Sequence, residues 1–339
     1  MIAICDFFSF LEVDFLQKSW QCYKRCQPFI LQYTFNMKII QSFWSKPFQT
    51  PYKNSFDSRA MGGFPFKRHF IYTWALSILR LKEHFQEVHL VTDDFGKQLM
   101  IDVFALPYTS FSTELNALDD MPTQFWCAGK LYVSAYTKCP FLHFDGDLIL
   151  GDLFDKSILK QPLVAEFHYE DKPKNYEKVI NQLCEPNANL LVFNEIKETI
   201  SKPDFIYNEY NLGIVGGNDY EFLNVYAEKS LDMVAQNKNI LLPDTVPVSF
   251  INCLIEQFNF YRMAQESNKK VTLCIEKKFD STFDYQASIL NQVTTDFSFV
   301  HLHGNYKLNY HELPERWLKH YYPDVYERIN AIVLGLSNE

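Results

Sequence analysis

The chain has 339 residues, of which 47% are hydrophobic and 22% are charged, and its formal net charge is −9. This composition is typical of a soluble globular protein with enough apolar residues for one large α/β domain or two average ones. The charge is acidic and no basic stripe stands out, so we expect no nucleic-acid partner.

Residues 1–36 precede the first clear strand pattern. The segment from Met1 to Phe15 is apolar, but it contains three acidic residues and has no basic region in front. It therefore predicts neither a secretory signal peptide nor a membrane span. We expect residues 1–36 to be a mis-assigned or loosely packed extension, and the domain proper to start at Met37.

The eight cysteines form no C-x-x-C pair, and Cys22 and Cys26 lack a second pair of ligands at zinc-binding spacing. Without a signal peptide, they are expected to be reduced thiols in a cytoplasmic protein. No transmembrane segment is predicted, and peripheral association with the inner face of a membrane stays open.

From residue 37 onward the sequence alternates between strand-like and helix-like segments. The expected strands are 38–44, 87–92, 109–115, 141–144, 162–167, 190–193, 212–215 and 297–301, and 45–65 is expected to be a loop. The expected helices are 67–83, 96–105, 124–136, 219–236 and 247–260. The β-α-β-α-β order of the first half predicts parallel strands with helices on both faces, and the second half predicts a mixed sheet in the same domain, 37–312. Residues 313–339 are expected to form a C-terminal helical tail.

Acidic residues follow two of the expected parallel strands. Asp93 follows strand 87–92, and Asp145 follows strand 141–144. Ligands of open α/β sheets bind at the carboxyl ends of the strands, so both aspartates are candidates for ligand binding.

Asp145-Gly146-Asp147 lies between two apolar runs. Two carboxylates one residue apart can turn toward one divalent cation that also holds a diphosphate. Charges pinned at a buried strand end need a cation or strong donors. The simpler alternative is a β-turn in which one aspartate serves as a cap.

A second motif follows strand 297–301. His301 ends the strand, Gly304 permits close approach of the backbone, and Lys307 supplies a positive charge. The imidazole can be a third metal ligand, and the ammonium can neutralise diphosphate charge. A structural histidine at a strand end is the alternative.

Together the two motifs resemble retaining glycosyltransferases of family 8, the glycogenin and bacterial lipo-oligosaccharide galactosyltransferase group. There a D-x-D turn is followed, more than a hundred residues later, by a strand and H-x-x-G-x-x-K. The resemblance implies a GT-A fold of the α/β class, with Mn²⁺ (or Mg²⁺) bound by Asp145, Asp147 and His301. It also implies a nucleotide-sugar donor, UDP-linked, whose diphosphate contacts Asp145, Gly304 and Lys307.

Three further segments are similar to parts of that family. Lys130 starts the helix before the D-x-D strand and is a candidate donor contact. Asn211, in Y-N-L-G, resembles an asparagine that faces the sugar. Glu256 and Gln257 resemble an acidic-plus-Gln pair near the reacting sugar. For each, a plain surface or turn residue is the alternative, and we expect Asp147, Asn211, Glu256 and Gln257 to act in catalysis.

The sequence also departs from that family. The spacer of the D-x-D is Gly146 rather than alanine, and the family's K-P-W is Lys307-Leu308-Asn309. The reaction implied is transfer of a sugar to a hydroxyl acceptor such as a glycan, with retention. An inverting enzyme would need a carboxylate base, for which Glu166 and Glu256 are candidates, and both Glu166 and His168 are expected near the cleft.

Two other functions stay open. A nucleotidyltransferase shares the α/β layout and acidic metal site, and residues 59–63 (RAMGG) are its only candidate phosphate loop. A protein that binds carbohydrate or nucleotide sugar without turnover is the other. Response to UDP with manganese, compared with nucleoside triphosphate and sugar phosphate, would separate them.

Overall fold

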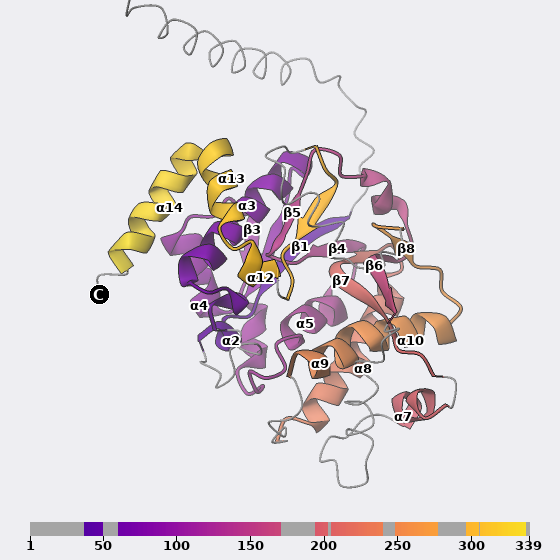
Figure 1. Cartoon of the computed structure of the whole chain (residues 1–339). Helices are drawn as coiled ribbons and strands as arrows, with labels where there is room; N and C mark the ends of the chain where they lie inside the picture. The colour runs from indigo at the N-terminus through magenta and orange to yellow at the C-terminus, as the bar shows by residue number, and fades with distance from the viewer. Residues whose placement is uncertain are drawn as a thin grey trace, which may run out of the picture. The chain divides into compact units, whose positions relative to one another are not determined.

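The computed structural model describes residues 37–49, 60–170, 194–202, 205–239, 248–276, 296–304 and 306–336. Within them a seven-stranded sheet has the order β3-β2-β1-β4-β7-β6-β8 (Figure 1). Its strands are β1 Lys38–Phe43, β2 His89–Thr92, β3 Ser110–Ser112, β4 Phe141–Phe144, β6 Val164–Glu170, β7 Asn208–Gly217 and β8 Thr272–Leu273. The expected extension 1–36 and the expected strand 190–193 lie outside the described residues.

The sheet is parallel in its first half and mixed in its second. The strands β3, β2, β1 and β4 are parallel neighbours. The strand β7 runs antiparallel to both β4 and β6, and β8 is parallel to β6. The α/β class with a mixed central sheet, as expected from the sequence, is therefore confirmed.

Both faces of the sheet are buried. Along β4, Phe141 packs in one hydrophobic cluster, whereas Leu142 and Phe144 pack in another. Along β7, Val215 and Ile214 separate in the same way. Successive side chains of a strand point to opposite faces, so this near-continuous apolar sequence is what a sheet covered on both faces requires.

The helices form two groups around the sheet (Figure 1). One cluster contains side chains of α3 Lys67–His84, α13 Leu313–Tyr321 and α14 Pro323–Leu336, which contact one another. The other contains side chains of α5 Ala128–Tyr136, α8 Tyr220–Gln236, α9 Val248–Cys253 and α10 Asn259–Glu266. Within the described residues, the remaining α-helices are the short α2 Ser45–Gln49, α4 Asp94–Lys97, α7 Asn194–Ile200 and α12 Tyr306–Asn309. The expected C-terminal helices thus pack on α3 and contribute to the core.

Local sequence explains several helix boundaries. Asp219 caps α8 by accepting a hydrogen bond from the backbone N–H of Phe222. The helix α10 ends before Asn268, which has a φ of 49°, a conformation that asparagine tolerates better than most residues. Pro323 separates α13 from α14, since a proline inside one continuous helix would remove a hydrogen bond.

Some elements differ from expectation. The helix expected at 96–105 is α4 followed by a π-helical turn, Gln98–Val103, and the helix expected from residue 124 starts at Ala128. The expected loop 45–65 contains α2 and a 3-10 turn, Ala60–Gly63. Two further 3-10 turns lie at Glu114–Leu118, which overlaps the end of the expected strand 109–115, and at Lys156–Lys160.

Two short strands outside the main sheet position the site. The strands β5 Leu148–Leu150 and β9 Phe299–His301 form an antiparallel pair in which Leu148 lies opposite His301. The helix α3 holds β5, since Arg80 Nε donates to the carbonyl oxygen of Leu150 at 2.8 Å. The sequence indicated only an apolar run at 148–150, because three residues are too few to show the alternation of side chains that marks a strand.

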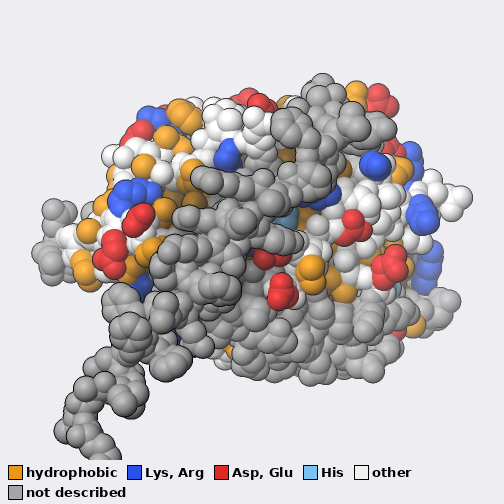
Figure 2. All heavy atoms as spheres, turned by 90° about the horizontal axis from the view of Figure 1, so that it is seen from above, with side chains coloured by type: hydrophobic (Ala, Val, Ile, Leu, Met, Phe, Trp, Pro, Cys, Tyr) orange, Lys and Arg blue, Asp and Glu red, His pale blue; other side chains and the backbone are white. Residues whose placement is uncertain are grey.

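None of the described helices is both long enough and apolar enough to cross a membrane. On the face shown in Figure 2, the described Lys and Arg side chains are interspersed with Asp and Glu side chains. On the coloured part of that face no single sign of charge dominates.

Candidate metal centre

Asp145, Gly146 and Asp147 form the turn that joins β4 to β5. The backbone N–H of Asp145 donates to the carbonyl oxygen of Gly213 at 2.9 Å, and that of Leu148 donates to the carbonyl oxygen of Asp145 at 3.1 Å. The carbonyl oxygen of Asp147 accepts from Leu302 N–H at 3.0 Å. The turn is therefore tied to β7 on one side and to the segment after β9 on the other.

Gly146 lies directly against Trp74 of α3. A Cβ at this position would stand 2.1 Å from Cε2, 2.2 Å from Cζ2 and 2.5 Å from Cδ2 of the Trp74 ring. An alanine would need the ring or the turn to move. The glycine spacer, a departure from the resembling family, thus follows from the tryptophan packed beneath the turn.

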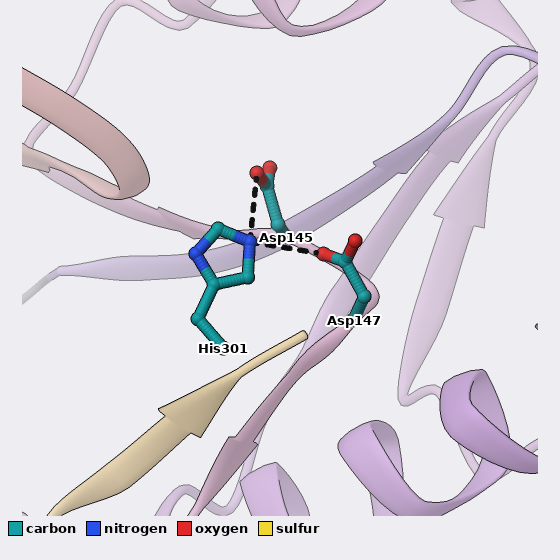
Figure 3. A group of neighbouring side chains, drawn as sticks. All are labelled: Asp145, Asp147 and His301. Carbon is teal, nitrogen blue, oxygen red and sulfur yellow. Dashed lines mark ion pairs between the residues drawn. The ribbon is translucent and has the colours of Figure 1, made fainter. Parts of the chain in front are cut away.

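The pairing of β5 with β9 brings His301 to the two aspartates (Figure 3). His301 Nε2 lies 3.2 Å from Asp147 Oδ1 and 3.9 Å from Asp145 Oδ2. One potential ligand atom from each residue lies within 4.8 Å of the others. The structure therefore brings together the three residues expected to bind a metal.

Lys130 joins the centre from the first turn of α5. Its Nζ lies 2.8 Å from Asp145 Oδ1 and 2.9 Å from Glu256 Oε1, and it donates to the carbonyl oxygen of Leu212 at 2.9 Å. A cation near a helix N-terminus interacts unfavourably with the helix dipole. The carboxylates of Asp145 and Glu256 compensate this unfavourable interaction. The reading of Lys130 as a solvated surface lysine is not what the structure shows.

Lys307 joins the centre from α12 and is 5% exposed. Its Nζ lies 2.6 Å from Asp147 Oδ2 and donates to the carbonyl oxygen of Gly62 at 3.0 Å. Gly304, with a φ of 52°, makes the turn between β9 and α12. A lysine thus accompanies each aspartate.

The electrostatics follow from burial and close charges. Burial raises the pKa of Asp145 to about 6, with Lys130 opposing and Asp147 adding to that rise. Burial also acts to raise the pKa of Asp147, but Lys307 and His301 outweigh it and hold that pKa well below its ordinary value. Burial acts to lower the pKa of His301, but Glu166 and Asp147 raise it to about 10. The pKa values of the two aspartates are therefore shifted in opposite directions. The raised pKa of His301 means that this residue must release a proton before it can bind a metal.

The donor atoms fit a divalent cation. Two carboxylates and one imidazole suit Mn²⁺, and carboxylate oxygens also suit Mg²⁺. All three residues also line a cleft, so a cation held by them would be reachable by a ligand bound there.

A cleft of about 490 Å³ adjoins the three residues. Its lining includes Lys130, Asn211, Glu256, Gln257 and Gly304, all expected site residues. Asn211 Oδ1 accepts from the backbone N–H of Gly213 at 3.0 Å. The described residues offer no partner to Asn211 Nδ2, which is thus available to a ligand.

Glu256 and Gln257 lie on a π-helical turn, Leu254–Phe258, between α9 and α10. Such turns widen a helix locally and are frequent at functional sites. The sequence indicated one continuous helix here, because a π turn leaves no pattern of its own.

Asp93 does not line the cleft. Its Oδ2 accepts from the backbone N–H of Ser45 at 2.7 Å and from Ser45 Oγ at 2.9 Å, and its Oδ1 accepts from Gly96 N–H at 2.7 Å. Asp93 is therefore a helix cap for α4 that also fixes the start of α2. The expected donor contact is not supported, since a strand-end aspartate and an N-cap look alike in sequence.

Glu166 and His168 also lie elsewhere than expected. Glu166 is fully buried and contacts His301 behind the cleft, and His168 stacks on Tyr261 with its ring centroid 5.6 Å away. Neither residue is among the cleft lining.

The aromatic wall of the cleft was not foreseen. Aromatic residues from four separate stretches of the chain contribute to it, namely Phe43, Trp44, Phe48, Phe70, Trp74, Trp126, Phe167 and Tyr169. The only signal in the sequence was the high aromatic content, which a Phe-rich core explains equally well.

A search of curated proteins finds no match to this sequence. Among solved structures, the galactosyltransferase LgtC in complex with donor and acceptor sugar analogues matches with a TM-score of 0.36 and 12% identity, over 83% of this chain and 96% of that chain. The apo form of the glycosyltransferase GlyE of Streptococcus pneumoniae TIGR4 matches with a TM-score of 0.35 and 13% identity, over 84% of this chain and 64% of that chain.

A second GlyE structure matches with a TM-score of 0.32 and 12% identity, over 82% of this chain and 60% of that one. The chain thus spans less than two thirds of the length of GlyE. The structural neighbours are glycosyltransferases, but TM-scores and identities this low carry no argument about function. Residues 37–332 match the model of the family of unknown function DUF6734, and the chain therefore belongs to that family.

Proposed function

We propose that this chain is a metal-dependent glycosyltransferase of the GT-A type that moves a sugar from a nucleotide-diphosphate donor, UDP-linked, to a hydroxyl acceptor such as a glycan. The observation that carries the proposal is the convergence of Asp145, Asp147 and His301 at one cleft, with Lys130 also in the cleft lining and Lys307 paired with Asp147 from outside that lining. Two carboxylates, an imidazole and two ammonium groups suit a cation together with a diphosphate.

The residues of the centre have different roles at the leaving group. A bound Mn²⁺ or Mg²⁺ ion would act there as a Lewis acid. Asp145, Asp147 and His301 would hold it, and Lys130 and Lys307 lie within 2.9 Å of the ligand carboxylates. Lys130 lines the cleft and can stabilise the charge that builds on the diphosphate as the glycosidic bond breaks, whereas Lys307 lies outside the lining and acts through its pairing with Asp147.

The rest of the cleft offers contacts for the nucleoside and the sugar. Phe48, a half-buried aromatic residue of the cleft lining, offers a surface on which a nucleobase can stack. Asn211 Nδ2 and the Gln257 amide can hydrogen-bond sugar hydroxyls. These contacts support a nucleotide sugar rather than a metal ion alone as the ligand.

Retention is favoured by the placement of the carboxylates. An inverting enzyme needs a carboxylate base at the acceptor hydroxyl. Glu166 is fully buried and does not line the cleft, and Glu256 is paired with Lys130. Glu209 also lines the cleft, but its Oε2 accepts a hydrogen bond from the Tyr207 hydroxyl at 2.7 Å. A retaining reaction, in which leaving-group oxygen takes the acceptor proton, requires none of the three.

Two rivals remain. Gly62 and Gly63, with φ values of 64° and 80°, form a tight turn, and Gly62 lines the cleft, which keeps nucleotidyl transfer as the second candidate. A protein that binds the donor without turnover is the third. We further propose a cytoplasmic location.

Thermal unfolding in the presence of UDP and Mn²⁺, followed by a screen of UDP-sugar hydrolysis, tests the proposal. We expect stabilisation by UDP that requires the metal, and slow release of UDP from one donor. Stabilisation by nucleoside triphosphate and sugar phosphate, with turnover to a nucleotide sugar, would instead favour nucleotidyl transfer. Stabilisation by UDP without turnover of any donor or acceptor would favour the binding protein.

A further inference from the structure

Glu166 is buried next to the candidate metal ligands but outside the cleft. It lies on β6, is 0% exposed, and its Oε2 lies 2.7 Å from His301 Nδ1. The other nitrogen of that ring, Nε2, faces Asp147 at 3.2 Å. The imidazole is therefore held between a buried carboxylate on one side and the metal-binding turn on the other.

The strand next to β6 is shaped to accommodate this contact. Ala165 pairs with Val215 and Phe167 with Asn211, so a two-residue step on β6 faces a four-residue step on β7. Glu166 lies at this irregularity. Bulges in a sheet re-aim side chains and are frequent next to active sites.

Gly213 sits in the irregular part of β7 and leaves the space that the pair occupies. A Cβ on Gly213 would lie 2.3 Å from Glu166 Oε2 and 2.5 Å from both Cε1 and Nδ1 of His301. The same stretch of β7 directs the carbonyl oxygen of Leu212 at Lys130 and that of Gly213 at the N–H of Asp145. The bulge therefore serves the centre through three separate contacts.

A simple structural role explains Glu166 poorly. Glu166 Oε1 is buried and has no hydrogen-bond partner among the described residues. A buried carboxylate with one satisfied oxygen is unfavourable unless a nearby positive group compensates it. His301, particularly when it binds a cation, is the group in contact that can do so.

We propose that Glu166 is a positioning residue that fixes His301 with Nε2 directed at the metal. The inference rests on the proposed metal site. Metal-binding histidines usually donate their second N–H to a carboxylate or carbonyl, which fixes the tautomer and the ring orientation and makes the imidazole a better ligand. Glu166 supplies that carboxylate here, and through it β6 contributes to a centre whose ligands come from β9 and the β4–β5 turn.

The test is Mn²⁺ binding to the full chain, measured by the EPR signal of free Mn²⁺ without any nucleotide. We expect Glu166→Gln to weaken Mn²⁺ binding by about 10- to 100-fold, the usual effect of losing such a contact. Glu166→Asp keeps the charge and should recover part of the affinity. Glu170→Gln, on the same strand but away from the cleft lining, is the matched control and should bind as the wild type does.

A second background separates positioning from general damage. In a His301→Gln chain, Glu166→Gln should cause no further loss of Mn²⁺ affinity, because its only route to the metal is already gone. An equal loss in both backgrounds, or an unchanged affinity of Glu166→Gln in the wild-type background, would overturn the inference. Failure of the wild-type protein to bind Mn²⁺ at all would overturn the proposed metal site itself. Urea unfolding of each variant verifies that it is folded.

Discussion

The contact between Gly146 and Trp74 predicts that alanine at position 146 destabilises the protein, and that removal of the Trp74 ring abolishes or reverses this effect. The variant Gly146→Ala adds a Cβ that would stand 2.1 Å from Cε2 of the Trp74 ring. Ordinary carbon–carbon contact begins at about 3.5 Å, so the ring and the turn must move apart by about 1.4 Å. Gly146 is not among the glycines with positive φ, so the backbone itself accepts alanine.

The magnitude follows from two opposing effects. Overpacking of this kind typically costs about 1–3 kcal/mol in the free energy of unfolding. In the absence of a clash, Gly to Ala stabilises by about 0.4–1 kcal/mol, because the unfolded chain loses freedom. We therefore expect Gly146→Ala to destabilise the wild-type protein, and to be neutral or stabilising in a Trp74→Ala chain, which lacks all three ring atoms that the new Cβ would meet.

Urea unfolding of the four chains in this cycle measures the coupling between the two positions, and EPR of free Mn²⁺ measures the consequence for the site. Since metal sites tolerate ligand shifts of only about 0.2 Å, we expect Gly146→Ala alone to weaken Mn²⁺ binding roughly tenfold. Equal destabilisation by Gly146→Ala with and without the Trp74 ring would refute the reasoning.

Three further predictions concern the surrounding charges. Lys130→Met leaves buried carboxylates without their cation, so we expect the free energy of unfolding to fall by about 3–5 kcal/mol in the absence of metal. Urea unfolding should show a smaller loss in the presence of Mn²⁺, and a loss that Mn²⁺ does not change would contradict this. Asp93→Ala removes a cap and should cost about 1–2 kcal/mol while leaving Mn²⁺ affinity unchanged, so loss of Mn²⁺ binding in a stable variant would restore its expected role at the site. Burial lowers the pKa of His69, His84 and His89 to about 4 in each case. Between pH 6.5 and pH 4 the unfolded chain therefore binds more protons, and the free energy of unfolding should fall as the pH falls through that window, whereas a flat profile would show that these histidines are not held neutral.

The metal ligands could be expected from the sequence because each has a local signature. Asp145 and Asp147 follow an apolar strand, and His301 ends another. The structure places both strand ends at one point, since β5, which follows the two aspartates, pairs with β9, which ends at His301. That pairing involves three residues on each side and gave no pattern of its own.

Asp93 shows where the same reasoning fails. The position of an aspartate after a parallel strand is the same whether it binds a ligand or caps the next helix. Which of the two applies depends on Ser45, almost fifty residues earlier in the chain, whose N–H and hydroxyl both donate to Asp93. Local sequence cannot show such a contact.

Glu166 and Gly146 depend on contacts of the same distant kind. Glu166 was expected near the cleft as a possible base, and it lies instead behind His301, 135 residues away in sequence. The glycine at 146 has its explanation in Trp74 on another element. Residue types near a strand end could be predicted, but the partner of each was set by the folded arrangement of β6, β7 and α3.

The most direct test of the account is calorimetric titration of UDP into the wild-type protein and into Asp147→Asn, each with and without Mn²⁺. Asp147→Asn keeps the shape of the side chain but removes the negative charge that faces His301 and Lys307. Asp120→Asn, at an exposed position outside the cleft lining, is the matched control. We predict UDP binding that requires Mn²⁺ in the wild type and in Asp120→Asn, and that is lost in Asp147→Asn. Manganese-dependent binding of UDP to Asp147→Asn at wild-type affinity would contradict the assignment of this centre.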